Sequence, residues 1–357
     1  MKYLITGGLG FIGSEIIRQL LKKSDTEFIF VIDNNSKHAT KNQICFDSSD
    51  PRVKILHEDL TEDSLDIFDL FYHNYMMSLP QEKRSSSWKM IFPDVIMHLA
   101  AKIGGIAYFH KYPYTILDEN NKMLSTMLEA IKRESLGVST PFQGRFVYVS
   151  SSMVFENSRQ YPTSEAYLDD CPIPLSAYGF SKLSGEFYCK AFCDEYKLDY
   201  VICRPFNAYG TNEYPEEVGM AHVIPDIIKK IDMGQGTENN PLEVLGDGDQ
   251  IRCYTHVEDV ADGIITATMH GLKGEAYNVS TPTPTTVTEL VNKIWRIMKP
   301  GEKLHTKRME PFIYDVQKRI PDVTKAKQQL NWEAKYSLES KLPETIKWVQ
   351  NVIRTNN

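Results

Sequence analysis

The chain has 357 residues, of which 42% are hydrophobic and 24% are charged, and its formal net charge is -7. This length suggests about two domains, and the composition is typical of a globular protein. The acidic balance excludes the broad basic surface that nucleic-acid binding requires, so we expect no nucleic-acid partner.

The six cysteines predict neither a disulfide framework nor a metal site. None forms a Cys-x-x-Cys pair, and no nearby His or Cys completes a metal set around Cys189 and Cys193. The N-terminus leads directly into an apolar strand pattern, so no signal peptide is expected. No apolar run approaches the roughly 20 residues of a membrane span. We therefore expect a cytoplasmic protein with free thiols, no metal and no membrane partner.

Short apolar runs alternate with helical patterns along the first part of the chain. The runs are almost continuously apolar, as expected of parallel strands buried on both faces. Helical patterns such as 14–22 and 120–133 separate them. Residues 74–89 resemble an insertion before the strand at 95–99, and its segment 81–87 is expected to form an exposed loop. The alternation predicts an α/β fold with a doubly wound parallel sheet of the Rossmann type. The expected strands are residues 3–5, 28–32, 53–56, 95–99 and 146–149.

The regular alternation weakens after a further expected strand at residues 200–204, which follows a helix beginning near Ser181. Proline, glycine and polar segments then become more frequent, which is typical of a less regular unit. We assign residues 1–204 to an NAD-binding domain. Residues 205–357 are assigned mainly to a smaller, mixed α/β substrate lobe, with segments around 241–280 returning to the first domain.

A glycine-rich turn follows the first expected strand and opens the first expected helix. Gly8, Gly10 and Gly13 fit the pattern Gly-x-Gly-x-x-Gly, and Gly7 gives a second, related spacing. Glycine allows the unusual turn, the close approach of a pyrophosphate, and tight packing of the helix on the strand. The helix N-terminus would face the phosphates with free N–H groups and its positive dipole end. The expected cofactor contacts in this turn are Gly7, Gly10, Phe11, Ile12 and Gly13.

Asp33 ends the second expected strand, 20 residues after Gly13. An acid at this place can bind the ribose hydroxyls of the cofactor and repel the 2′-phosphate of NADP. Asn34, rather than an arginine, follows it, so NAD is the expected cofactor and both residues are expected contacts. A turn is the alternative role for Asp33 taken alone, because Asp-Asn-Asn is a good turn sequence.

Tyr178 and Lys182 form a Tyr-x-x-x-Lys pair. Positions i and i+4 of a helix share one face, so the ammonium can lower the pKa of the phenol, with help from a nicotinamide charge. A phenolate near neutral pH is a usable base for a hydroxyl group. The pair is common by chance, and core packing is the alternative role for Tyr178 taken alone.

Three serines, Ser150, Ser151 and Ser152, follow the expected strand at residues 146–149. Open α/β sheets bind ligands at the carboxyl ends of their strands. A hydroxyl there can donate a hydrogen bond to a reacting oxygen and relay a proton, whereas capping of a turn or helix is the alternative.

In this order and spacing, the three signals resemble the extended short-chain dehydrogenases/reductases, and within them the NAD-dependent epimerase/dehydratase family. The resemblance covers nearly the full length of the chain, and it implies a nucleotide-diphospho-sugar substrate. The segments that carry it are residues 6–13, 59–60, 98–101, 150–155, 178–182, 204–210, 252–259 and 277–279.

The resemblance also implies a role for individual residues. Ser151 would be the catalytic hydroxyl, Tyr178 the base, and Lys182 its partner, which also holds the nicotinamide ribose. Arg252 and Arg319 would bind the diphosphate, which suits guanidinium geometry, although surface ion pairs are the alternative. The other implied cofactor contacts are Asp59, Leu60, Leu99, Ala100, Ala101 and Pro205. The other implied substrate contacts are Gly104, Ser152, Met153, Asn207, His222 and Val223.

The type of reaction is indicated by the residues that follow the catalytic hydroxyl. Dehydratases of this family carry an Asp-Glu pair where this chain has Ser152 and Met153, and a thioether cannot transfer protons. Residues 100–106 resemble a segment of GDP-fucose synthases and GDP-mannose 3,5-epimerases, which have a cysteine in place of Met153. Residues 221–225 resemble a GDP-fucose synthase segment that carries a catalytic acid. His222 could be an acid, a substrate contact, or a solvent-facing residue at a helix start.

These considerations favour NAD-dependent epimerisation of a nucleotide sugar through a transient ketone, with C4 as the expected carbon. The alternatives are a nucleotide-sugar 4-dehydrogenase or ketoreductase and a 3,5-epimerase acting on a GDP-sugar. A 4,6-dehydratase and a non-catalytic NAD-binding subunit are less favoured. The resemblance also implies a homodimer, in which helices around 120–133 and 178–196 pair as a four-helix bundle. Candidate interface residues, which could equally be buried within one monomer, are Met123, Met127, Leu128, Phe187, Tyr188 and Phe192.

Overall fold

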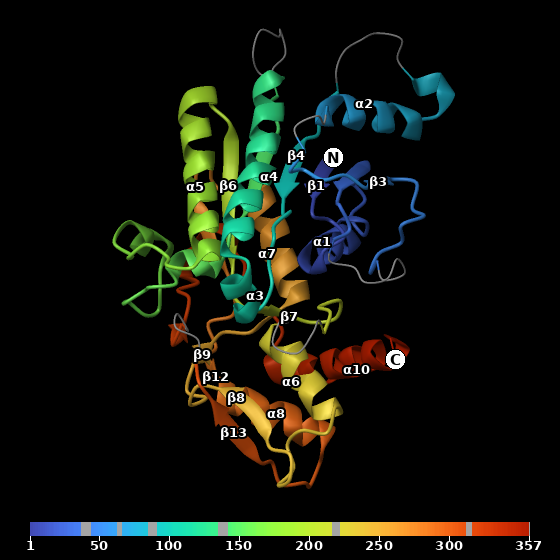
Figure 1. The fold of residues 1–357 in the computed structure, drawn as a ribbon. Helices are drawn as coiled ribbons and strands as arrows, with labels where there is room; N and C mark the ends of the chain where they lie inside the picture. Colours follow the sequence, from blue (N-terminus) through green and yellow to red (C-terminus); the bar gives the residue numbers. More distant parts are fainter. Residues whose placement is uncertain are drawn as a thin grey trace.

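The computed structural model describes residues 1–36, 44–62, 66–84, 91–134, 142–215, 222–311 and 316–356. Seven parallel strands form the main sheet, in the order β11-β6-β5-β4-β1-β2-β3 (Figure 1). The strands are β1 (Lys2–Thr6), β2 (Phe28–Ile32), β3 (Val53–Leu56), β4 (Val95–His98), β5 (Arg145–Val149), β6 (Asp199–Pro205) and β11 (Ala276–Val279). The predicted Rossmann-type sheet is confirmed.

The sheet order places a crevice between β1 and β4. The chain moves outward from β1 to β2 and β3, then returns to place β4 on the other side of β1. Open α/β sheets bind ligands at such a reversal, beyond the carboxyl ends of the strands. Every residue of β2 is buried, as expected of a strand covered on both faces.

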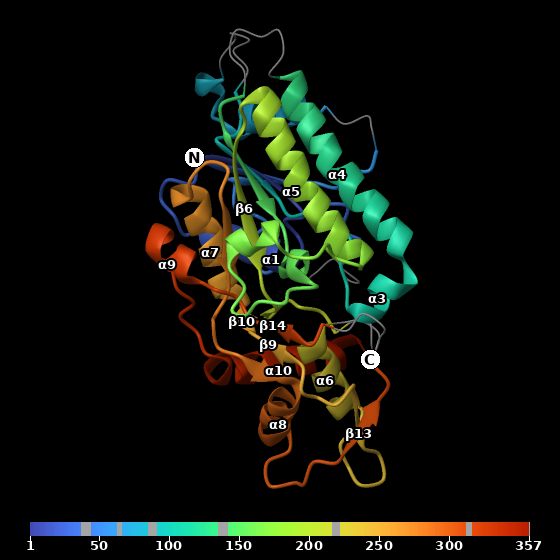
Figure 2. The ribbon, with the colours of Figure 1, turned by 90° about the vertical axis from the view of Figure 1, so that its left-hand side faces the viewer.

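Helices cover both faces of the sheet, each with its own apolar core (Figures 1 and 2). Residues from α1 (Phe11–Leu20), α7 (Val257–His270) and α9 (Thr324–Leu330) join one core. Residues from α2 (Ile67–Ser78), α4 (Pro113–Arg133) and α5 (Ala177–Tyr196) join the other. Figure 2 shows α4 and α5 side by side in front of the sheet.

A smaller unit with a third apolar core lies below the sheet in Figure 1. Its helices are α6 (Val223–Asp232), α8 (Val287–Met298) and α10 (Leu338–Asn356). Its short strands are β8 (Leu242–Leu245) paired with β13 (Thr306–Met309), and β9 (Ile251–Arg252) between β12 (Thr285–Thr286) and β14 (Lys318–Arg319). The predicted mixed α/β lobe is confirmed.

The segment 241–280 is shared between the two units. Its first strands, β8 and β9, lie in the smaller unit, whereas α7 and β11 pack on or within the main sheet. Between them, β10 (Thr255–His256) pairs with β7 (Ala208–Tyr209), which follows β6.

Some predicted boundaries were wrong. Helices α1, α4 and α5 begin earlier than expected, at Phe11, Pro113 and Ala177. The expected insertion at 74–89 begins inside α2, which continues to Ser78, and a 3-10 turn follows at Gln81–Lys83 within the expected loop. Residues 85–89 lie outside the described part of the chain. Among the described residues, no helix has both the length and the apolar character needed to cross a membrane.

Candidate active site

A cavity of about 1030 Å³ opens where the carboxyl ends of the main-sheet strands face the smaller unit. It brings together all but one of the residues expected to be catalytic or to contact the cofactor or substrate. They are Gly7, Gly10, Phe11, Ile12, Gly13, Asp33, Asn34, Leu60, Leu99, Ala100, Ala101, Gly104, Ser151, Ser152, Met153, Tyr178, Lys182, Pro205, Asn207, His222, Val223, Arg252 and Arg319. Asp59 is outside the lining, but its carboxylate accepts a hydrogen bond of 2.8 Å from Asn34 Nδ2.

The glycine turn between β1 and α1 leaves no room for side chains. Gly7 has a φ of +69°, and a Cβ atom there would lie 2.6 Å from the backbone nitrogen of Ala100. A Cβ atom on Gly13 would lie 2.3 Å from the carbonyl oxygen of Gly7. Gly10 caps α1 without a side-chain hydrogen bond, so the first turn can offer its N–H groups to a ligand. These features fit the pyrophosphate of a dinucleotide.

Asp33 serves the turn and lines the cavity at the same time. Its Oδ2 accepts a hydrogen bond of 2.9 Å from the backbone N–H of Leu9, and its Oδ1 accepts one of 2.8 Å from Asn35. The two roles considered for Asp33 are therefore compatible, because each carboxylate oxygen can accept more than one hydrogen bond. The contact with Leu9 ties the carboxylate to the glycine turn.

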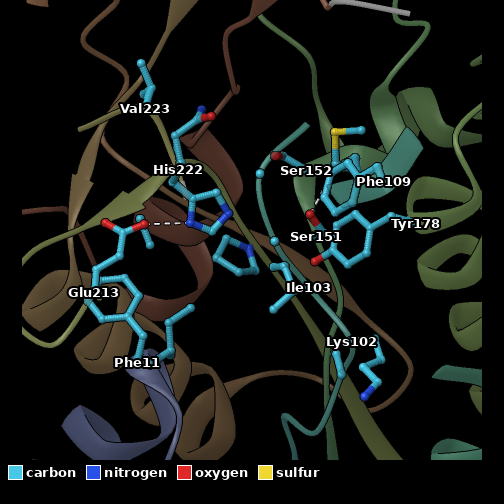
Figure 3. A pocket seen from close by; sticks show the side chains of 18 of the residues that line it. Phe11, Lys102, Ile103, Phe109, Ser151, Ser152, Tyr178, Glu213, His222 and Val223 are labelled. Atoms are coloured by element: carbon cyan, nitrogen blue, oxygen red, sulfur yellow. Dashed lines mark hydrogen bonds and ion pairs between the residues drawn. The ribbon is translucent and has the colours of Figure 1, made fainter. Parts of the chain in front are cut away.

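Ser151 and Tyr178 meet at the wall of the cavity (Figure 3). Tyr178 lies in the first turn of α5, whose N-cap Ser176 accepts a hydrogen bond from Gly179. Ser151 follows β5 and caps a 3-10 turn (Ser152–Phe155) by accepting a hydrogen bond of 3.2 Å from the Met153 N–H. Its side chain also hydrogen-bonds the Tyr178 side chain. The Ser151 side chain thus both caps the 3-10 turn and contacts the phenol of Tyr178.

The electrostatics of the Tyr178–Lys182 pair differ from the expectation. Burial raises the pKa of Tyr178 to about 12, although the hydrogen bond with Ser151 and the charge of Arg319 act to lower it. Burial also lowers the pKa of Lys182 to about 8, while Glu186 acts to raise it. In the chain without its cofactor, desolvation therefore outweighs the nearby charges at Tyr178, and the lowering of the phenol pKa by Lys182 and a bound nicotinamide stays a prediction.

Lys182 is held by the end of β5 and lies beneath the tyrosine ring. Its Nζ donates a hydrogen bond of 2.9 Å to the carbonyl oxygen of Val149 and lies 6.0 Å from the centroid of the Tyr178 ring. One turn further along α5, the buried Glu186 pairs with Arg204, with Arg204 Nη2 and Glu186 Oε2 2.7 Å apart. Ser150 Oγ donates a hydrogen bond of 2.6 Å to Glu186 Oε1. The sequence analysis missed Glu186, which its i+4 spacing from Lys182 could have indicated.

Arg319 lies in the cavity lining beside Met153 and Asn207. Its Nη2 lies 2.9 Å from Met153 Sδ, and its Nη1 donates a hydrogen bond of 3.3 Å to Asn207 Oδ1. On the neighbouring strand, Arg252 is in register with Arg319. The two guanidinium groups, both in the cavity lining, provide positive charge for an anionic ligand.

Two further side chains were missed by sequence reasoning. Phe109, in α3 (Ile106–Lys111), stacks on the ring of Tyr178. Glu213 lies in the loop after β7 and pairs with His222, whose Nδ1 is 2.6 Å from Glu213 Oε1. Neither residue belongs to a recognisable sequence motif, so only the folded chain brings them to the site.

The chain is similar over nearly its whole length to known nucleotide-sugar enzymes. A putative UDP-glucose 4-epimerase of Methanocaldococcus jannaschii is 29% identical over 99% of this chain and 99% of its own length. A dTDP-glucose 4,6-dehydratase of Haemophilus influenzae is 27% identical over 98% of this chain and 97% of its own. The crystal structure of a UDP-glucose 4-epimerase of Thermotoga maritima with UDP-glucose superposes with a TM-score of 0.78 at 28% identity, covering 99% of this chain and 100% of that one.

The family model named "NAD dependent epimerase/dehydratase family" matches residues 3–280. This match covers most of the chain, including the glycine turn, the serines after β5 and the helix that carries Tyr178. NAD is the cofactor that this family uses and that the glycine turn and Asp33 fit. The chain therefore belongs to the NAD-dependent epimerase/dehydratase family.

Proposed function

We propose that this chain is a nucleotide-sugar epimerase that oxidises a sugar hydroxyl, at C4, to a transient ketone and reduces it again. The proposal rests on one observation: Ser151, Tyr178 and Lys182 converge in the cavity that the glycine turn also lines, with Ser151 hydrogen-bonded to Tyr178 and Lys182 Nζ 6.0 Å from the Tyr178 ring centroid. The volume of about 1030 Å³ is at the upper end of the usual range for ligand sites, as needed for a dinucleotide beside a nucleotide sugar. The UDP-glucose 4-epimerase relatives support this reaction.

In this mechanism the residues of the chain move the proton. The glycine turn and Asp33 would hold NAD, which would supply the acceptor and donor of hydride for the sugar carbon. Ser151 donates a hydrogen bond to the reacting oxygen, and the Tyr178 phenolate takes the hydroxyl proton directly or through Ser151. Lys182, when protonated, stabilises the phenolate and holds the ribose next to it. Arg252 and Arg319 hold the diphosphate while the sugar ring presents its other face.

The residues after Ser151 argue against dehydration. Ser152 and Met153 stand where dehydratases carry proton-transferring carboxylates, and the Met153 thioether contacts Arg319 instead. Net oxidation at C4 requires that the ketone leave before it is reduced and that NADH be exchanged for NAD, and net reduction is the reverse process, so the product assay must distinguish these reactions from epimerisation.

The test is proton NMR of the purified protein with UDP-glucose, UDP-N-acetylglucosamine, UDP-glucuronic acid, dTDP-glucose, CDP-glucose and GDP-mannose, with no cofactor added. We expect one of these sugars to be converted into its C4 epimer by cofactor retained in the protein. The same panel identifies the nucleobase, which the local resemblance to GDP-sugar enzymes and the UDP-sugar relatives leave open. Turnover only after NAD or NADH is supplied would replace the epimerase by a dehydrogenase or ketoreductase.

A Tyr178→Phe variant tests whether catalysis is the role of the protein. The variant retains the ring and its stacking partner and removes only the hydroxyl. We expect it to retain cofactor and to lose turnover. Full activity in this variant would leave a non-catalytic binding role for the Ser-Tyr-Lys set.

We also propose that the chain is a homodimer in the cytoplasm. The outer face of α4 and α5 exposes Tyr114, Phe187 and Tyr188, and a shallow groove runs between the two helices. Four other candidate interface residues, Met123, Met127, Leu128 and Phe192, are buried within the monomer. All six cysteines are free, as a reducing compartment would keep them. Sedimentation of the wild type against Phe187→Glu tests the dimer, which the variant is expected to lose.

A further inference from the structure

Glu156 is a buried carboxylate that lies between the two elements carrying Ser151 and Tyr178. It directly follows the 3-10 turn Ser152–Phe155, which Ser151 caps at its other end. Glu156 is 7% exposed, and it lines the same cavity as the serine and the tyrosine. The proton transfer proposed above makes no use of this acid, so its place next to the reacting groups needs a separate explanation.

One oxygen of this carboxylate holds the start of α5. Glu156 Oε2 accepts a hydrogen bond of 2.8 Å from the backbone N–H of Leu175 and one of 2.9 Å from that of Ser176. Ser176 is the N-cap of α5, and its Oγ accepts a hydrogen bond from the Gly179 N–H. A single side chain therefore connects the 3-10 turn after β5 to the cap of the helix that carries Tyr178.

The backbone has little freedom at this junction. A Cβ atom on Gly179 would lie 2.8 Å from the Met153 carbonyl oxygen, so the first turn of α5 packs directly on the 3-10 turn. A second link comes from Asn157, whose Nδ2 donates a hydrogen bond of 2.6 Å to the Ile173 carbonyl oxygen. Glu156 and Asn157 thus hold the same loop before α5, and side chains as well as packing fix the distance between the two elements.

The charge of Glu156 is stabilised by the backbone that it holds. Among the described residues, its hydrogen-bond partners are the two N–H groups, and no Lys, Arg or His side chain forms an ion pair with it. Burial of a carboxylate without a cation costs free energy. The N–H groups and the positive end of the α5 dipole offset part of this cost. The carboxylate and the helix start therefore stabilise each other only while they stay together.

We propose that Glu156 is a positioning residue that sets the contact between Ser151 and Tyr178. The Ser151 side chain hydrogen-bonds the Tyr178 side chain (Figure 3). A hydrogen bond weakens steeply as its length or angle departs from the optimum. Release of the α5 start from the 3-10 turn would move the phenol away from the serine hydroxyl. The inference rests on the proposed function only for the catalytic use of this contact.

The first readout reports the contact without requiring turnover. Fluorotyrosine is incorporated in place of tyrosine, and the Tyr178 resonance is identified by its absence from the fluorine NMR spectrum of Tyr178→Phe. Ser151→Ala gives the chemical shift of a Tyr178 ring that lacks the serine contact. Glu156→Met keeps the length of the side chain and replaces the carboxylate by a thioether. We expect its Tyr178 resonance to move toward the Ser151→Ala position.

The second readout is the turnover rate of the holoprotein. We expect kcat of Glu156→Met to fall by about tenfold to hundredfold because the reacting groups are misplaced, while the amount of retained NAD is unchanged. Glu156→Gln should keep the wild-type shift and most of the wild-type kcat, since its amide oxygen can accept both N–H groups. Glu156→Asp is one methylene shorter and should give intermediate values. It also keeps the test available if Glu156→Met does not fold.

Asp259 offers a matched control within the chain. It is also buried, and its Oδ2 accepts hydrogen bonds of 3.0 and 2.9 Å from two consecutive backbone N–H groups, those of Lys335 and Tyr336. It is outside the cavity lining. Asp259→Leu should lower the free energy of unfolding as Glu156→Met does. Its Tyr178 resonance should stay in place, and its kcat, measured where the variant is folded, should remain near the wild-type value.

Three results would contradict the positioning role. An unmoved Tyr178 resonance in Glu156→Met and Glu156→Asp would overturn it. Equal losses of kcat in Glu156→Met and Asp259→Leu would mean that only stability is affected. Loss of the contact in Glu156→Gln would assign the effect to charge and not to the two hydrogen bonds. If the wild type converted no nucleotide sugar, the epimerase proposal would fail, but the fluorine shifts would still decide whether Glu156 sets the contact.

Discussion

The aromatic rings of Phe109 and Tyr178 stack with their centroids 4.6 Å apart and their planes 10° from parallel. Phe109 comes from the short helix α3, and Tyr178 from the first turn of α5. The stacked ring keeps water from one face of the tyrosine, whose pKa burial raises to about 12. The position and the acidity of the phenol therefore both depend on a residue outside the Ser-Tyr-Lys set.

Phe109→Ala is expected to lower the pKa of Tyr178 toward its ordinary value of 10 by admitting water. The phenolate then forms at lower pH, so the acidic limb of the pH–rate profile moves to lower pH. We expect the plateau kcat to fall about tenfold because the ring is less well held. Phe180→Ala, which removes an exposed ring from the same turn of α5, is the control and should leave the profile unchanged.

Lys182 is expected to make the stability of the fold rise with pH. Its pKa is about 8 in the folded chain and near 10.5 when exposed, so the unfolded chain binds more protons between these values. Unfolding free energy therefore increases from about pH 8 to pH 10.5, by on the order of 3 kcal/mol. Below about pH 8, Lys182 is protonated in both the folded and the unfolded chain, so its contribution to the unfolding free energy no longer changes with pH.

The measurement is urea unfolding of the wild type and of Lys182→Met at pH 7.5, 8.5 and 9.5. The unfolding free energy of the wild type should rise relative to that of Lys182→Met as the pH increases. A difference that is constant over this range would show that Lys182 has an ordinary pKa in the fold.

Glu186→Gln is expected to lower the free energy of unfolding. It is also expected to lower the pH at which activity is lost on the basic side of the pH–rate profile. The variant leaves the buried Arg204 without its carboxylate, which costs about 3 kcal/mol. Since Glu186 raises the pKa of Lys182, its loss lets Lys182 deprotonate at lower pH. The basic limb of the kcat/KM profile should move down by about one pH unit.

A double variant separates these two effects. Glu186→Leu combined with Arg204→Met removes both charges, so stability should recover while the basic limb stays displaced. If the basic limb also returned to its wild-type position in the double variant, Glu186 would act on stability alone and not on the pKa of Lys182.

Asp33→Asn is expected to weaken discrimination between the two nicotinamide cofactors. The amide keeps one oxygen to accept the Leu9 N–H, but it removes the charge that repels a 2′-phosphate. The ratio of the Kd for NADPH to the Kd for NADH, measured by fluorescence, should fall about tenfold. Asp47→Asn, an exposed acid outside the cavity, is the control.

The sequence predicted features that are local in the chain. The strands of the main sheet followed from continuous apolar runs, and the glycine turn with Asp33 followed from spacing within one strand–helix–strand unit. Helix starts were less well predicted: α4 begins at Pro113, and the apolar pattern used to locate it is clear only from about residue 120. The end of α2 was assigned to an insertion because a run of charged residues and serines, 81–87, follows it closely.

Contacts between distant segments could not be predicted in the same way. Arg319 reaches Met153 across 166 positions, and the sequence assigned it only to the diphosphate. Glu213 and Phe109 carry no motif, and their partners are set by how loops after β7 and β4 fold over the cavity. The raised pKa of Tyr178 depends on burial from several elements, which pairwise spacing does not encode.

The position of β14 late in the chain has a consequence for synthesis. By Val279 all seven strands of the main sheet have been made, together with the glycine turn, Ser151 and Tyr178. Arg319 and α10, which closes the core of the smaller unit, are made only afterwards. On the ribosome, the dinucleotide half of the cavity can therefore form before the half that faces the other ligand.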